Sequence, residues 1–181
     1  TRTVTGVDDS LDEDNETVIV DISSVTNGNE SGTQQQTTTL TDDDATPSIT
    51  LSVDNANIAE SGGVATFTAT SDAVSGRNIT VNLAYTGTAT GTGTDYTASG
   101  TSITITAGST TGTRTVTGVD DSLDEDNETV IVDISSVTNG NESGTQQQST
   151  TITDDDAAPS VTLSVDNANI AESGGVATFT A

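Results

Sequence analysis

Nearly all the side chains of this sequence that could do chemistry are carboxylates, and in the stretch 45–156 they gather where strands are expected to end. A charge run is most often a solvated surface. Consecutive carboxylates repel, however, because unit charges 4 Å apart interact at about 4 kcal/mol near a protein surface. Calcium takes several oxygen ligands and tolerates irregular geometry. The pattern therefore favours calcium binding by these groups: Glu60, Asp95, the run Asp120–Glu128, and Asp154–Asp156.

The residue types that are missing argue against an enzyme. The sequence has no His, Cys, Met, Trp or Lys, and its basic residues are Arg2, Arg77 and Arg114. Without His or Cys, the common general bases, nucleophile–base pairs and zinc sites cannot be built. Carboxylate-only chemistry such as glycoside hydrolysis would need a cleft that holds a sugar, and two Phe and two Tyr offer little to stack on one. We expect no catalytic residues.

The net charge of -25 on 181 residues limits the classes of partner that the chain can bind. A surface of this sign repels nucleic-acid phosphates and anionic lipids, and it attracts cations. No apolar run approaches the roughly 20 residues of a membrane span. The expected partners are thus calcium ions and neighbouring repeats in the same chain, with no nucleic acid and no membrane insertion within this segment.

The chain is internally repeated. Residues 1–69 recur at 113–181 with an offset of 112, and only four positions differ: Thr37/Ser149, Leu40/Ile152, Thr46/Ala158 and Ile49/Val161. A period of this length fits one small domain per repeat, since solenoid repeats run about 20–50 residues. We therefore expect the C-terminal part of one repeat at 1–44, a complete repeat at 45–156, and the N-terminal strands of the next at 157–181.

Short apolar/polar alternations, separated by turn signals, fill the complete repeat. Period two with β-branched residues predicts half-buried strands, and about seven of them predict an all-β, immunoglobulin-like antiparallel sandwich repeated in tandem. The pair Asn139-Gly140 predicts a hairpin that leads to the strand of Ile152. For Arg114 we expect a cross-strand ion pair.

Several motifs occur in an order and spacing that resemble the Calx-beta domain, a family found in sodium–calcium exchangers, integrin β4 and many large bacterial surface proteins. The resemblance runs through the whole repeat. The motifs that carry it are Ile58-Ala59-Glu60-Ser61-Gly62-Gly63, Gly87-Thr88-Ala89, Gly93-Thr94-Asp95-Tyr96, Ala107-Gly108, Val119–Glu128 and Ile152–Asp156.

The resemblance implies a specific ligand set for Ca2+. In the complete repeat it consists of Glu60, Asp95, Asp120, Asp121, Glu125, Glu128, Asp154, Asp155 and Asp156, with the backbone carbonyl of Leu123. The matching residues of the partial copies are Asp8, Asp9, Glu13, Glu16, Asp42, Asp43, Asp44 and Glu172. Ser122 stands where the exchanger motif has a third consecutive Asp, so the number of ions per site stays open.

Two functions from different classes fit these features of the sequence. The first is a structural repeat of an extracellular stalk, adhesin or filament at the cell surface, in which Ca2+ at the domain junctions rigidifies the array. The alternative is a calcium-sensing regulatory domain that changes conformation to control an attached protein. Near-identical copies favour the first, because a spacer gains from length whereas a switch gains little from repetition. Exposed edge strands would also allow lateral or end-to-end self-association.

Overall fold

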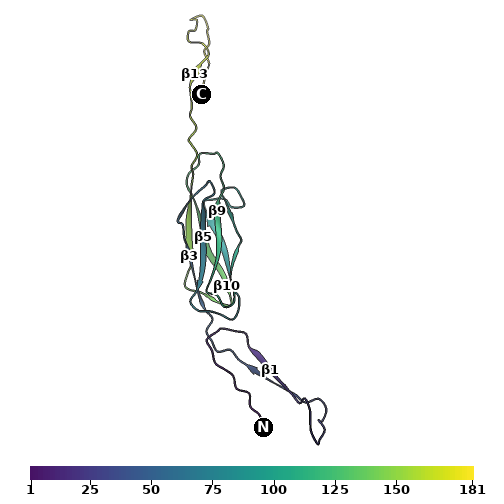
Figure 1. The fold of residues 1–181 in the computed structure, drawn as a ribbon. Helices are drawn as coiled ribbons and strands as arrows, with labels where there is room; N and C mark the ends of the chain where they lie inside the picture. The colour runs from purple at the N-terminus through teal and green to yellow at the C-terminus, as the bar shows by residue number, and fades with distance from the viewer.

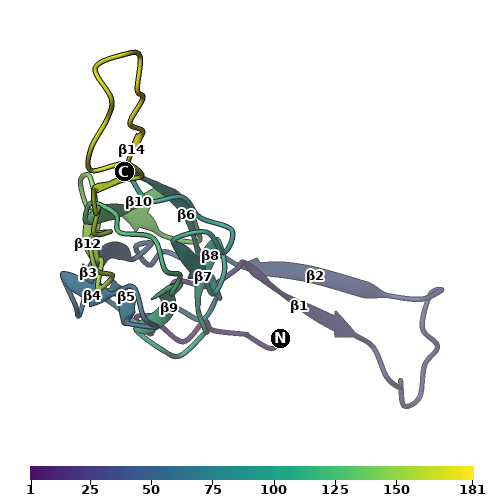
Figure 2. The same ribbon diagram turned by 90° about the horizontal axis from the view of Figure 1, so that it is seen from above.

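The computed structural model describes residues 1–181 as an elongated molecule with three parts (Figure 1). A hairpin of β1 (Glu16–Asp21) and β2 (Gln35–Leu40) lies towards one end, a β-sandwich occupies the middle, and an extended strip with β13 (Ser164–Val165) and β14 (Phe179–Thr180) lies at the other end. Viewed along the molecule, the hairpin projects to one side of the sandwich (Figure 2). No helix with the length and apolarity to cross a membrane is present.

The sandwich consists of two five-stranded sheets. The order of the first sheet is β4-β12-β10-β6-β8, and the order of the second is β11-β3-β5-β9-β7. Neighbouring strands are antiparallel except for β4 with β12 and β11 with β3, which are parallel. The strands are β3 (Ser48–Val53), β4 (Asn57–Ala59), β5 (Val64–Ser71), β6 (Ile79–Gly87), β7 (Tyr96–Ala98), β8 (Ser102–Ile105), β9 (Thr111–Gly118), β10 (Glu128–Thr138), β11 (Asn141–Glu142) and β12 (Gln147–Thr153).

The core follows from the period-two pattern of the strands. In β5, Ala65, Phe67 and Ala69 are buried while the threonines between them face outward or lie at partly covered positions. Alternate side chains of a strand point to opposite faces of its sheet, so each sheet turns one apolar face inward. Together the two faces form a core of 17 buried residues in which Phe67 is the only phenylalanine.

The predicted sandwich is confirmed. The lengths of its strands show which strands an apolar/polar alternation in the sequence can reveal. Within the sandwich, seven strands have four or more residues: β3, β5, β6, β8, β9, β10 and β12. The remaining three, β4, β7 and β11, have two or three residues each. A segment this short holds too few residues to show a period, so it is visible only once its partner strand is known.

The predicted hairpin at Asn139-Gly140 is wrong in its connection. The chain does turn there, with Asn139 at a φ of 58°. It then enters β11, which pairs with β3 of the other sheet, and returns to the first sheet only at β12. Strands β10 and β12 are antiparallel neighbours, but a short strand of the opposite sheet separates them along the chain.

The predicted cross-strand ion pair of Arg114 is also wrong. Arg114 lies opposite Phe67 on the neighbouring strand. Its Nη1 donates a hydrogen bond to the carbonyl of Thr113, 3.1 Å away. Both ion pairs of the structure belong to Arg77 instead.

The partial copy reproduces the local structure of the complete one but not its burial. Glu16 pairs with Leu40 in the hairpin, and Glu128 pairs with Ile152 in the sandwich, which is the same register shifted by one repeat. Val20 is nevertheless 54% exposed, whereas its counterpart Val132 is 0% exposed. The strand pairing is therefore encoded locally, while the core requires the whole repeat.

The two copies of one phenylalanine offer a test of this core. Phe67 is 1% exposed, and its counterpart Phe179 is 67% exposed. Phe67→Ala is expected to lower the free energy of unfolding of the sandwich by about 3–5 kcal/mol, as is usual for a buried aromatic residue. Phe179→Ala should change it by less than about 0.5 kcal/mol. Urea unfolding of the full chain measures both, and equal effects of the two substitutions would contradict the assignment of the core.

Candidate metal centre

Strand pairing gathers the predicted ligands at one pole of the sandwich. Strands β4 and β12 run parallel with Ala59 opposite Thr153, so Glu60 and Asp154 leave the sheet side by side. The amide of Glu60 donates to the carbonyl of Thr153 at 3.0 Å. Because both strands end at this pole, the opening Glu and the closing Asp triplet meet although they are far apart in sequence.

A second pair of strands brings in Asp95 and the acidic loop. Tyr96 at the start of β7 lies opposite Gly118 at the end of β9. The amide of Val119 donates to the carbonyl of Asp95 at 3.0 Å. Gly118 also lies so close to Glu60 that a Cβ there would stand 2.8 Å from the Glu60 carbonyl oxygen. This close approach starts the run Asp120–Glu128 directly beside Glu60.

Two groups of carboxylates share Glu60. One consists of Glu60, Asp154 and Asp156, and the other of Glu60, Asp121 and Glu125. Within each group, one oxygen of every residue lies within 4.8 Å of the others. Glu60 is only 5% exposed. A buried carboxylate at the meeting point of two such groups is the central feature of the site.

Further acidic residues surround this point. A small cavity is lined by Asp95, Glu128 and Asp126 together with members of both groups, and Ile152 is its apolar wall. The ligand prediction omitted Asp126, because it was based on the motifs of the family. Its place inside the acidic run is the signal that could have found it.

Hydrogen bonds from the chain fix several of these carboxylates. Asp95 accepts from the amide of Thr90. Asp121 Oδ1 accepts from the amide of Leu123 at 2.7 Å, and Asn127 Oδ1 accepts from the amide of Asp154 at 3.2 Å. Asn127 thus ties the acidic loop to the closing triplet, a role that its residue type alone did not indicate.

The remaining predicted ligands lie at the margin. Asp155 accepts a hydrogen bond from Ser61 Oγ at 3.1 Å. Asp120 is exposed and acts on Asp156 by charge repulsion. The side chain of Leu123 is exposed, which suits a residue expected to offer only its carbonyl. These three do not join either of the close groups.

The electrostatics of the site disfavour ionisation of its own carboxylates. Burial raises the pKa of Glu60, and the charges of Asp121, Asp154 and Asp156 raise it further, against a backbone hydrogen bond from Asp121 that lowers it. Burial and the same neighbours raise the pKa of Glu125. Burial raises the pKa of Glu128 to about 7, helped by a hydrogen bond and charge repulsion from Asp95. The site therefore concentrates negative charge that a cation would relieve.

The donor set fits calcium. All the side chains gathered here offer oxygen, which is the ligand that Ca2+ prefers. Asp154 Oδ1 is buried and has no hydrogen-bond partner, although a buried carboxylate oxygen normally requires one. Both ion pairs of the structure lie elsewhere, at Arg77. A divalent cation would satisfy the unpaired oxygen and the surplus charge together.

The preceding copy gathers its carboxylates less closely. All its predicted ligands line one hollow, namely Asp8, Asp9, Glu13, Glu16, Asp42, Asp43 and Asp44. No three of them bring oxygens within 4.8 Å of one another. The described part of this copy includes no counterpart of Glu60 or Asp95, because both residue numbers are smaller than the repeat offset of 112. Glu172 in the C-terminal strip is exposed and joins no group.

Comparison with known proteins agrees with this architecture. Residues 42–156 match the Calx-beta domain family, so the chain belongs to that family. Calx-beta domains are non-enzymatic domains that bind calcium, and the expectation that this chain is no enzyme is confirmed. Residues 11–35 also match the LVIVD repeat. No curated protein matches.

The fold is similar to that of a solved Calx structure. The structure of CBD12 from CALX1.2 is 14% identical with a TM-score of 0.51, and the match covers 60% of this chain and 44% of that one. The apo-form Calx CBD1 domain is 18% identical with a TM-score of 0.47, covering 60% of this chain and 98% of that one. The match thus spans less than half the length of the first structure.

The raised pKa of Glu128 predicts how stability depends on pH. The folded chain binds a proton at Glu128 up to about pH 7, and the unfolded chain only up to about 4.5. The resulting stabilisation is complete below the lower value and is lost as the pH rises through the upper one. In chelator, the melting temperature should therefore fall between about pH 5 and 8.

Substitutions separate the contribution of Glu128 to the pH dependence from that of the other acidic residues. Glu128→Gln should flatten the dependence of melting temperature on pH, whereas Glu16→Gln, the same change at the equivalent position of the preceding copy, should leave it unchanged. Circular dichroism melts of the full chain provide the measurement. A melting temperature that rises with pH in chelator would contradict the charge balance of this site.

Proposed function

We propose that this chain is a calcium-binding structural repeat of an extracellular stalk, adhesin or filament, in which Ca2+ at the domain junctions rigidifies the array. The observation that carries the proposal is the buried carboxylate of Glu60, shared by two groups of acidic side chains. Burying an uncompensated charge costs several kcal/mol. Such a residue is best understood as a ligand whose charge a cation neutralises.

The close groups supply the central ligands. Glu60, Asp154 and Asp156 would hold calcium on one side, and Glu60, Asp121 and Glu125 on the other. Asp95 and Glu128 line the adjoining cavity and would complete the oxygen set. Asp120, Asp155 and the carbonyl of Leu123 stay predicted ligands that rest on the family resemblance.

The position of the site supports a role in stiffening. The triplet Asp154–Asp156 would supply ligands to the ion. It also leads directly into the extended segment towards β13 (Figure 1). Binding of an ion to these residues would fix the direction in which the chain leaves the domain. Asp42–Asp44 occupy the same place before β3, where Pro47 stiffens the linker. The elongated arrangement of the three parts fits a rod.

The extracellular location is part of the same proposal. Calcium modules outside the cell bind at about 10⁻⁴–10⁻³ M, whereas intracellular sensors bind at about 10⁻⁷–10⁻⁵ M. Near-identical neighbouring copies suit a spacer. A measured affinity in the sensor range would favour the regulatory alternative.

Calcium titration of a Glu60 variant tests the shared site. Calorimetry on the full chain should show saturable binding, and calcium at 100 times the dissociation constant should stabilise the sandwich by about 2.7 kcal/mol. Because Glu60 belongs to both groups, Glu60→Gln should weaken binding at least about tenfold, or ~1.4 kcal/mol. Asp156→Asn should weaken it less, since Asp156 belongs to one group.

The control removes one negative charge far from the site. Asp21→Asn changes an exposed residue of β1 and should leave the affinity unchanged. If wild-type chain gives no binding heat and no shift in melting temperature, the carboxylates are a solvated surface and the proposal fails.

A further inference from the structure

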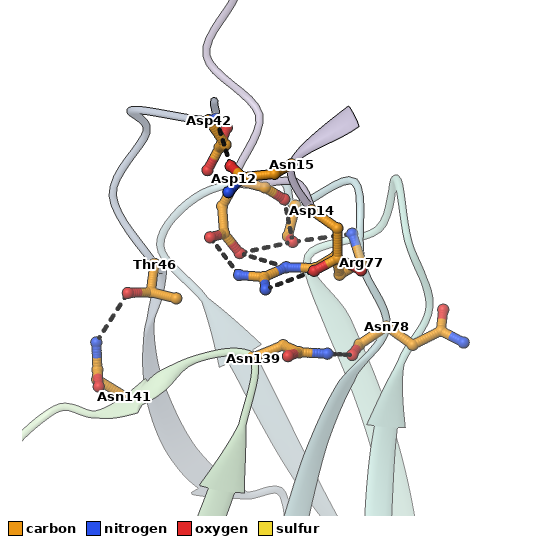
Figure 3. A network of polar contacts seen from close by, with 10 residues as sticks. Asp12, Asp14, Asn15, Asp42, Thr46, Arg77, Asn78, Asn139 and Asn141 are labelled. Carbon is orange, nitrogen blue, oxygen red and sulfur yellow. Dashed lines mark hydrogen bonds and ion pairs between the residues drawn. The ribbon is translucent and has the colours of Figure 1, made fainter. Parts of the chain in front are cut away.

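The opposite pole of the sandwich makes a different contact with the preceding copy. The loop between β5 and β6 contains Ser75, Gly76 and Arg77, and it meets the acidic loop of residues 8–16 (Figure 3). Asp12 and Ser75 form an isolated parallel β-bridge. Two segments that are more than sixty residues apart thus join without belonging to a common sheet.

Both backbone and side chains take part in this contact. The Asp12 carbonyl accepts from the amide of Gly76 at 3.1 Å and from Ser75 Oγ at 3.0 Å. The Asp12 carboxylate accepts from Arg77 Nε at 3.3 Å and from Arg77 Nη2. Arg77 Nη1 reaches Asp14 Oδ1 at 3.1 Å. The guanidinium therefore spans two carboxylates of the incoming loop, as its planar fork allows.

Asp12 is the anchor of this contact. It is 4% exposed and Ser75 is 1% exposed. The Asp14 side chain is 85% exposed, so its pairing with Arg77 is screened by solvent. A buried charge that loses its partner is strongly destabilising. The pairing of Asp12 with Arg77 should therefore contribute strongly to holding the two copies together.

Gly76 leaves room for the side chain of Glu13. A Cβ at Gly76 would stand 2.6 Å from Glu13 Oε1 and 2.7 Å from Glu13 Cγ. Any larger residue would push Glu13 away. The sequence Ser75-Gly76-Arg77 thus combines a hydroxyl donor, a position without a side chain and a forked cation, each in contact with the loop around Asp12.

Other hydrogen bonds hold the loop of Ser75, Gly76 and Arg77 in place. The amide of Gly108 donates to the Ser75 carbonyl at 2.9 Å, and Asn139 Nδ2 donates to the Asn78 carbonyl at 2.9 Å (Figure 3). The linker is fixed nearby, because the amide of Asn141 donates to the Pro47 carbonyl at 2.8 Å. The loop and the linker therefore attach the preceding copy at two separate points.

We propose that Ser75, Gly76 and Arg77 form a receptor for the acidic loop of a second copy of this repeat, with Asp12 as the residue that enters it. Residues 8–16 are such a loop, already seated. The complete repeat carries the identical loop, in which Asp124 is the counterpart of Asp12. Asp124 is exposed, and it is the residue that enters the receptor of a following copy.

This junction lies at the opposite pole of the sandwich from the metal centre of the complete repeat. Asp12 and Asp124 are not among the expected ligands, and the contact forms entirely from protein groups. Glu13, one residue on, is an expected ligand, so one loop serves both purposes through neighbouring side chains. Measurements in chelator therefore test the junction whether or not the chain binds calcium.

Distances between spin labels test the contact within the full chain. The sequence contains no cysteine, so Thr37→Cys and Ser52→Cys place labels on the exposed faces of β2 and β3. In chelator, wild-type chain should give a narrow distance distribution. Arg77→Ala should broaden it about twofold or more, because domains joined by a small interface move freely once its contacts are lost. Arg77→Lys keeps the charge but not the planar fork, so its distance distribution should be intermediate in width between those of wild type and Arg77→Ala.

Two kinds of control variant show whether the effect is specific to the contact between Asp12 and Arg77. Arg2→Ala removes a positive charge from an exposed residue and should leave the distribution narrow. Asp12→Ala should broaden it as much as Arg77→Ala, and the double variant should add nothing further. An unchanged distribution in both single variants would overturn the receptor, and a melting curve confirms that each sandwich remains folded.

A peptide tests whether a second copy fits. With three arginines in the chain, the Nε–H resonance of Arg77 is readily assigned by NMR. In the Asp12→Ala, Asp14→Ala chain, a peptide of residues 119–128 should shift this resonance saturably at millimolar concentration in chelator. The same peptide with Asp124→Ala should have at least about a tenfold weaker effect. Equal shifts by both peptides, or none, would show that Asp124 is not the entering residue.

Discussion

The repulsion between carboxylates that the fold confines at one pole is the constraint on which the functional features of this domain depend. The parallel pairing of β4 with β12 brings Glu60 and Asp154 out side by side, and burial removes the water that would screen them. The result is a high local negative charge with no arginine to balance it. The fold thus accepts an electrostatic cost that an external cation can remove.

The core beneath this pole is modest, and it explains why the repeat acts as a unit. Its members are mainly Ile and Val, with Phe67 the largest fully buried side chain. Strand β1 pairs with β2 in the register of β10 with β12, yet Val20 stays exposed because no second sheet covers it. Hydrogen-bond register is a local property. Burial needs both sheets, and with a core of this size little stability is left to offset charge repulsion.

The negative charge of the acidic loops is balanced differently at the two poles of the sandwich. At the metal centre, several carboxylates converge without a protein cation. At the junction, the same type of loop is held by Arg77, one of three basic residues in the chain. Asp12 and Glu13 are adjacent in this loop. Asp12 pairs with Arg77 of the next domain, while Glu13 lies beside Gly76 and also lines the acidic hollow of its own copy. Ion binding and domain docking would then act on the same short segment.

The sequence by itself determined the sandwich class, the repeat and the acidic residues that form the site, because period-two alternation and clustered charge are local signals. It could not indicate that Glu60 would be buried and shared, since this depends on the parallel pairing of β4, a strand of three residues, with a strand more than ninety residues later. Asp126 and Asn127 were missed for a similar reason. The hairpin at Asn139 was misassigned, because a turn signal does not reveal which sheet the next strand joins. The role of Arg77 depended on the distance between segments more than sixty residues apart, which only the tertiary structure decides.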